Sequence, residues 1–173
     1  MAAGDTIFLF PAVMWVGDGD AQLVAGDEWP TFVVHEGRMS LAFDDTDEEA
    51  AVSVEIPCPA HYDGGGLKAI IHFYMASDNS NDIALDIFVE AKTPDSDTLD
   101  LESAASWDSA NSGTVSLSGS TAGDPLTLEI TLSNDDSIAV GDLVRFGIRR
   151  DCDSADDDAT GDLYLSAVEI QET

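Results

Sequence analysis

The chain has 173 residues, of which 35 are acidic and only 6 are Lys or Arg, and its formal net charge is −29. A hydrophobic fraction of 44% is that of a folded protein, which excludes an acidic disordered tail. Direct nucleic-acid binding is excluded because phosphate contacts need clustered basic side chains. A membrane partner is also not expected, because no apolar run approaches the roughly 18 residues of a transmembrane helix.

The carboxylates are spread along the whole chain, and they would repel one another strongly in dilute buffer. At about 1 M salt the Debye length is only about 3 Å, and most of this repulsion disappears. We interpret the composition as adaptation to molar salt, as in a halophilic organism or its virus. An acidic surface kept for solubility at ordinary ionic strength is the alternative.

Cys58 and Cys152 are the only cysteines, and two in a chain of this length do not form a disulfide scaffold. We expect both to be buried free thiols. The first five residues lack the basic region of a signal peptide, so we expect synthesis in the cytoplasm and export, if any, through assembly or lysis.

Residues 7–16, IFLFPAVMWV, form the first expected strand, and both of its faces are apolar. Such a strand is covered on both sides, either as a central strand beneath a loop or second sheet, or as an arm that packs on a neighbouring subunit. Pro11 favours an edge or bulge position because it cannot donate to a ladder. In the second interpretation the docking side chains are Phe8, Phe10, Met14 and Trp15.

Alternating apolar and polar residues then predict a series of short strands. In chain order they cover residues 31–35, 39–43, 52–56, 67–76, 83–92, 114–118, 126–133, 144–149 and 163–170. In the first of these we expect Phe32 and Val34 to point inward. The strands within Leu67–Lys92 are interpreted as one long hairpin, and residues 94–113 as a long loop anchored by Trp107.

The last third of the chain shows the clearest strand signals. Two runs open with the same turn signal, Gly141-Asp142 and Gly161-Asp162. In the final run the alternation slips by one residue at Ser166, which predicts a β-bulge.

Regularly spaced strands without an amphipathic helix predict an all-β protein, an antiparallel β-sandwich of jelly-roll type. We expect a single domain over residues 1–173, with residues 1–20 as an N-terminal docking strand or arm.

The segment from Asp151 to Asp162 is the most acidic loop, with six carboxylates. A hard cation such as Ca²⁺ takes six to eight oxygen ligands, so Asp151, Asp153, Asp156 and Asp158 are candidate Ca²⁺ ligands. Two other interpretations stay open. Half of the basic residues, at positions 145, 149 and 150, stand just before the loop and would neutralise it. The loop would otherwise be a solvated, salt-tolerant turn.

No catalytic constellation is present, so no enzyme activity and no required cofactor are expected. His35, His61 and His72 lack the spacing of a metal cluster, and the segment 119–123 has Thr where a nucleophilic Ser would be needed. The large aromatic residues are candidates for stacking on sugar rings, although burial in a sandwich core is the commoner fate of such side chains. They are Trp15, Trp29, Trp107 and Tyr62.

Residues 67–171 resemble the jelly-roll virion proteins of tailed bacteriophages and archaeal viruses. The resemblance lies in the order of a long hairpin, a wandering loop, the run LTLEITL at 126–132, the run GDLVRFGIRRD at 141–151, and the run GDLYLSAVEI at 161–170. It carries over no catalytic residue. It implies a structural subunit located on the virion, such as a capsid decoration, turret, or tail or fibre component.

Together with the acidity, the resemblance leads us to expect a non-enzymatic virion subunit of a haloarchaeal virus. Its expected partners are copies of itself, as a homotrimer or homopentamer, and other virion proteins such as the major capsid protein, held by apolar contacts. Two alternatives stay open: a carbohydrate-binding jelly-roll module with exposed aromatic side chains on one sheet face, or a single jelly-roll major capsid protein.

Overall fold

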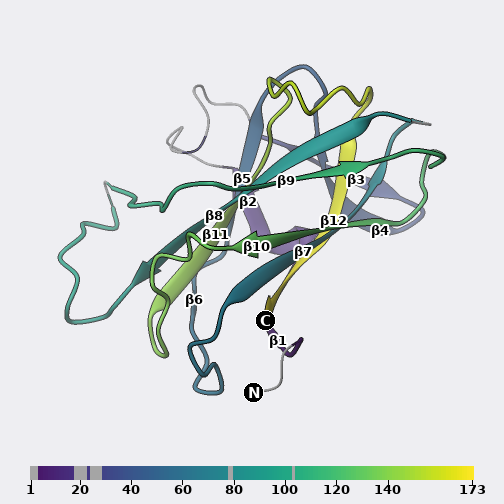
Figure 1. Cartoon of the computed structure of the whole chain (residues 1–173). Coiled ribbons are helices and arrows are strands. Elements are labelled where there is room, and N and C mark those ends of the chain that lie inside the picture. The colour runs from purple at the N-terminus through teal and green to yellow at the C-terminus, as the bar shows by residue number, and fades with distance from the viewer. Residues whose placement is uncertain (1–3, 18–22, 24–28, 78–79, 103) are drawn as a thin grey trace.

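The computed structural model describes residues 4–17, 23, 29–77, 80–102 and 104–173. Two six-stranded antiparallel sheets enclose one hydrophobic core (Figure 1). The chain is thus an all-β sandwich of jelly-roll type, as its alternating sequence predicts.

Sheet A has the strand order β10-β7-β12-β4-β3, and β1 also pairs with β12. Its strands are β1 (Thr6–Pro11), β3 (Thr31–His35), β4 (Arg38–Phe43), β7 (Leu67–Met75), β10 (Leu126–Leu132) and β12 (Leu163–Glu172). Strands β4 and β1 pair with different halves of β12, so they follow one another along the same side of that strand.

Sheet B has the order β2-β5-β11-β8-β9, and β6 also pairs with β11. Its strands are β2 (Trp15–Gly17), β5 (Glu49–Ser53), β6 (Ile56–Pro57), β8 (Asp82–Lys92), β9 (Asn111–Ser116) and β11 (Leu143–Arg150).

Strand β7 shows how alternation builds the core. Its burial pattern is strictly two-fold, with every second side chain from Leu67 to Met75 buried and those between them half-buried. The buried set meets the inward side chains of sheet B, and the other set forms the outer face of sheet A. The slip predicted at Ser166 is confirmed, because the register between β12 and β7 shifts between Leu165 and Ala167.

The long hairpin expected within Leu67–Lys92 is wrong. Strands β7 and β8 have the expected positions and alternation, but β7 belongs to sheet A and β8 to sheet B. Strand β7 pairs with β10 and β12, whereas β8 pairs with β9 and β11. The chain therefore crosses from one sheet to the other after Met75. Alternation does not reveal this crossing, because it shows which side chains of a strand point inward but not which strand lies beside it.

The N-terminal apolar run also changes sheets. Strand β1 pairs in sheet A, the short 3-10 helix η1 (Ala12–Met14) turns the chain, and β2 pairs in sheet B. The predicted docking residues Phe8, Phe10 and Trp15 are buried in the chain's own core, and Met14 packs against it. The run therefore contributes core side chains to both sheets, but its second apolar face is not covered, because Leu9, Val13 and Val16 are exposed.

Two other apolar positions differ from expectation. Phe32 and Val34 lie on the face of β3 that continues the inner side of sheet A, but they are 50% and 62% exposed. Strand β3 is the edge of sheet A, so these side chains extend past the shelter of the core.

Both cysteines are free, Cys58 buried and Cys152 half-buried, and burial raises the pKa of each thiol to about 11. In the part of the chain that is described, no helix has the length and apolar character needed to cross a bilayer.

Candidate functional site

The outer face of sheet B is covered. Leu23 packs with Ala50 and Val52 in a small second apolar cluster, and Phe88 and Trp107 pack against it. The loop that carries Trp107 is fixed to β8 through its backbone, because the Asp108 amide donates to the Val89 carbonyl at 2.9 Å.

Two carboxylates are buried under this cover, Asp86 at 2% and Glu90 at 1% exposure. Each has an arginine partner on the neighbouring strand β11: Arg149 donates to Asp86 and Arg145 donates to Glu90. The guanidinium of Arg145 also lies 4.6 Å from the centre of the Trp107 ring. Buried carboxylates need such partners, so these pairs hold the covered face together and are not free to take a ligand.

The outer face of sheet A, in contrast, carries a groove of about 620 Å³. Its walls and floor come from the β3–β4 hairpin, from β7, from the bulged part of β12 and from the segment that leads into β10. The lining residues are His35, Glu36, Arg38, His72, Phe73, Tyr74, Gly123, Pro125, Leu126, Thr127 and Ser166. Small-molecule and glycan sites in proteins commonly have volumes of about 300–1,000 Å³, so the groove is large enough for several sugar rings.

An aromatic cluster lies at one end of the groove. The ring centroids of Tyr74 and Tyr164 are 5.0 Å apart, and His35 lies 4.8 Å from Tyr164. The Tyr74 hydroxyl lies 3.1 Å from His35 Nδ1 and 3.2 Å from Ser40 Oγ, which fixes its orientation. Burial, followed by the nearby Asp162 carboxylate, raises the pKa of Tyr164, so its phenol stays neutral. A rigid aromatic surface with hydroxyl and imidazole groups at its rim can both stack and hydrogen-bond.

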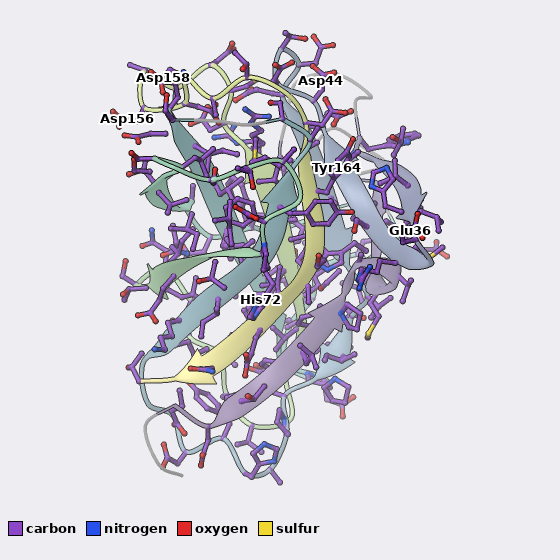
Figure 2. The ribbon with its side chains drawn as sticks, turned by 90° about the vertical axis from the view of Figure 1, so that its right-hand side faces the viewer. Glu36, Asp44, His72, Asp156, Asp158 and Tyr164 are labelled. Carbon is purple, nitrogen blue, oxygen red and sulfur yellow. The ribbon has the colours of Figure 1, made fainter. Side chains whose placement is uncertain are left out.

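The groove continues along β7 to His72. Nε2 of His72 lies 3.8 Å from a carboxylate oxygen of Glu169 on β12. The side-chain amide of Gln171 donates to the same carboxylate at 3.0 Å. The hydrogen bond from Gln171, and then that from Thr6, holds the pKa of Glu169 below its ordinary value. Figure 2 shows His72 near the middle of this face, with Tyr164 above it and Glu36 on the adjacent hairpin.

The predicted Ca²⁺ ligands lie elsewhere, at the end of the sandwich where Figure 2 shows Asp156 and Asp158. Asp158 accepts a hydrogen bond from the Asp82 amide at 2.8 Å, and Asp151 lies 3.7 Å from Arg149. The structure does not gather Asp151, Asp153, Asp156 and Asp158 into one group within the range of a single ion among the described residues. A Ca²⁺ ion bound by them stays a prediction.

The acidic loop is instead organised around Arg150, whose side chain is fully buried. Its guanidinium donates to both oxygens of Asp157, at 3.0 and 3.1 Å, and to the carbonyls of Ala159 and Gly161. The predicted neutralisation of the loop by arginine is therefore confirmed for Arg150 and for Arg149, which pairs with Asp151, whereas Arg145 pairs with Glu90 of β8 instead.

One group of carboxylates with metal-like spacing does occur in the described part of the chain. Oxygens of Asp44, Asp45 and Asp162 lie within 4.8 Å of one another. Burial, and then the charges of Asp44 and Asp45, raise the pKa of Asp162, whereas hydrogen bonds from Thr46 lower that of Asp44. The Gly161 amide already donates to Asp45, which uses part of the group's capacity.

The aromatic residues singled out from the sequence do not form the groove. Trp15 and Tyr62 are buried in the core, and Trp107 covers sheet B. Trp29 is exposed, but its ring packs over Gly17. Sequence reasoning missed Tyr74 and Tyr164, although both occupy outward positions of alternating strands, which was the available signal.

Neither family models nor curated proteins match the sequence. Solved structures do match over almost the whole chain. The family 11 carbohydrate-binding module of Clostridium thermocellum, in complex with a β-1,3-1,4-mixed-linked tetrasaccharide, is 10% identical with a TM-score of 0.51, and the match covers 98% of this chain and 96% of that one.

Two further structures match as well. The CBM22-2 xylan-binding domain from Paenibacillus barcinonensis is 15% identical with a TM-score of 0.50, over 96% of this chain and 99% of that one. The mannan-recognising module TmCBM27 is 11% identical with a TM-score of 0.50, over 99% of each chain. At these identities the likeness establishes the shared jelly-roll sandwich alone. All three are carbohydrate-binding modules.

Proposed function

We propose that the chain is a non-catalytic carbohydrate-binding module that holds a polysaccharide in the groove on sheet A. The observation that carries the proposal is the pair His35 and Tyr74, which line a groove on the outer face of sheet A and pack against the ring of Tyr164. The solved structures that share this fold support it, because their printed ligands are xylan, mannan and a mixed-linked glucan oligosaccharide.

The chemistry of the groove suits a sugar chain. Aromatic surface removes the apolar faces of sugar rings from water, and side chains such as Tyr74 and Thr127 offer hydroxyl groups for the ring substituents. The groove is not an enclosed cavity, so it would accept internal segments of a chain. Placement on a haloarchaeal virus particle, assembly into a trimer or pentamer, and a capsid partner stay predictions from the sequence.

The direct test is affinity electrophoresis and calorimetry with soluble xylan, mannan and mixed-linked β-glucan, in ordinary buffer and at about 1 M NaCl, where charge repulsion is screened. We expect binding to at least one glycan, and a loss of about tenfold or more in the Tyr74→Ala variant, because a buried aromatic contact and its hydrogen bonds disappear together.

The matched control is Phe32→Ala, which removes an exposed aromatic side chain that does not line the groove. Its affinity should equal that of the unmodified chain. Failure to bind any glycan, neutral or acidic, at both salt concentrations would overturn the proposal, and so would equal binding by the Tyr74→Ala and unmodified proteins.

A further inference from the structure

Arg38 differs from every other lysine and arginine of the chain. Five of the six basic side chains lie within 4.0 Å of a carboxylate. Arg38 is exposed, and its side chain forms no ion pair or hydrogen bond with any residue of the described ranges. In a protein with 35 carboxylates, a guanidinium that pairs with none of those in the described ranges is an uncommon arrangement.

Arg38 lies on the hairpin that forms one wall of the groove. It pairs with His35 across the β3–β4 hairpin, and it shares a face of β4 with Ser40, which contacts the Tyr74 hydroxyl. Arg38 therefore lies on the groove side of the hairpin, beside the aromatic cluster, and it is one of the lining residues.

The groove also collects other polar groups, although Nε2 of His72 faces the Glu169 carboxylate. Two of the three histidines of the chain, His35 and His72, line it, together with the hydroxyl groups of Thr127 and Ser166. Glu36 is the one acidic residue of the lining. The groove is thus close to neutral on a molecule whose formal charge is −29.

From this arrangement we propose that the groove selects a glycan that carries carboxylates, a uronate-containing polysaccharide, and that Arg38 binds a sugar carboxylate. The inference rests on the proposed function and specifies its ligand class. A guanidinium presents its N–H groups in a planar fork that matches a carboxylate, so Arg38 would distinguish a uronate from the corresponding neutral sugar.

Long-range charge opposes such a ligand, and this gives the proposal an unusual signature. A net charge of −29 repels a polyanion at distances beyond the Debye length, whereas the contact with Arg38 acts at hydrogen-bond distance. Added salt removes the repulsion first. We therefore expect affinity for a uronate polymer to rise as NaCl increases from about 0.1 M to about 1 M, which is opposite to ordinary ion-pair-driven binding.

The experiment compares two forms of one polymer in calcium-free buffer, polygalacturonate and its fully methyl-esterified form. The backbone is the same, and only the first carries charge. We expect the unmodified protein to prefer polygalacturonate at about 1 M NaCl, and Arg38→Gln to lower that affinity about tenfold while affinity for the ester stays within about twofold. The matched control is Lys68→Gln, which removes the same charge from sheet A at a residue that pairs with Glu129 outside the groove lining.

The outcomes separate the two proposals. Equal or tighter binding of the ester, or an Arg38→Gln variant that still prefers polygalacturonate, would overturn the carboxylate inference and leave the glycan-binding function in place. An equal loss in Arg38→Gln and Lys68→Gln would overturn it too, since net charge and not a local contact would then be responsible. Failure to bind these polymers and every neutral glycan would overturn both proposals.

Discussion

The outer faces of the two sheets differ in how far they are covered. On sheet B, Asp86 and Glu90 are buried, each is paired with an arginine, and Leu23 and Trp107 cover the surface. On sheet A the polar side chains stay partly exposed around an open groove. The comparison shows that the same alternating strand pattern supports a structural face or a binding face, and that the loops packed on it decide which.

The largest expected difference in stability between the two faces comes from removing one partner of an ion pair. Replacing Glu90 with Ala leaves the Arg145 guanidinium without its buried partner on sheet B, and we expect a loss of about 3 kcal/mol in the free energy of unfolding. Urea unfolding is the suitable measurement, because urea does not change ionic strength.

The matched change on the open face is Glu129→Ala. Glu129 is 57% exposed in its pair with Lys68, and its removal should change stability by less than about 1 kcal/mol. Equal effects of the two substitutions would mean that the covered face is not held by its ion pairs.

A smaller loss of stability is expected when an apolar side chain that packs on the outer face of sheet B is truncated. Leu23 is 8% exposed and packs over Gly147 on the outer face of sheet B, so Leu23→Ala should cost about 2 kcal/mol in thermal or urea unfolding. On sheet A, Phe32→Ala removes a larger side chain that is half exposed, and it should cost less than about 1 kcal/mol. If the Phe32 change costs more, the edge of sheet A is sheltered in solution.

The smallest effect belongs to Glu169 on the open face. Its folded-state pKa is depressed by the hydrogen bonds from Gln171 and Thr6, so its stabilising effect is complete above its ordinary pKa of 4.5 and is lost as pH falls through the lower folded value. At neutral pH, Glu169→Gln should lower stability by about 0.5 kcal/mol or less.

Thermal unfolding at several pH values tests this sign. The midpoints of Glu169→Gln and the unmodified chain should approach one another as pH falls below 4.5, the ordinary pKa of the carboxyl. A difference that grows as pH falls would show that the carboxylate is stabilised in its protonated form instead.

The sequence predicts where the strands lie better than it predicts which strands pair with one another. Alternation correctly places most strands and the bulge at Ser166, because each strand buries one face. It does not show that β7 and β8 lie in different sheets, nor that the run through Phe10 and Trp15 serves both sheets. These facts depend on long-range pairing, which no local pattern contains.

The candidate site can be predicted from the sequence only in part, because its residues come from strands that are distant in the chain. Tyr74 comes from β7, Tyr164 from β12 and His35 from β3, and each is an unremarkable outward residue on its own strand. The acidic loop has a clear signal in the sequence because its charges are adjacent, yet the buried Arg150–Asp157 pair organises it. Adjacency in sequence is a weak guide in a sandwich whose neighbours come from distant segments.

The order of strands also has a consequence for how the chain is made. Strand β12 lies between β7 and the β4–β1 side of sheet A, and β11 lies between β5 and β8 of sheet B, so both sheets receive a central strand from residues 143–172. Earlier strands must leave the ribosome before their partners exist, and such non-local pairing is slow. The dense negative charge then acts on the nascent chain as well as on the finished fold, because mutual repulsion keeps unpaired edges of neighbouring chains apart until β11 and β12 arrive.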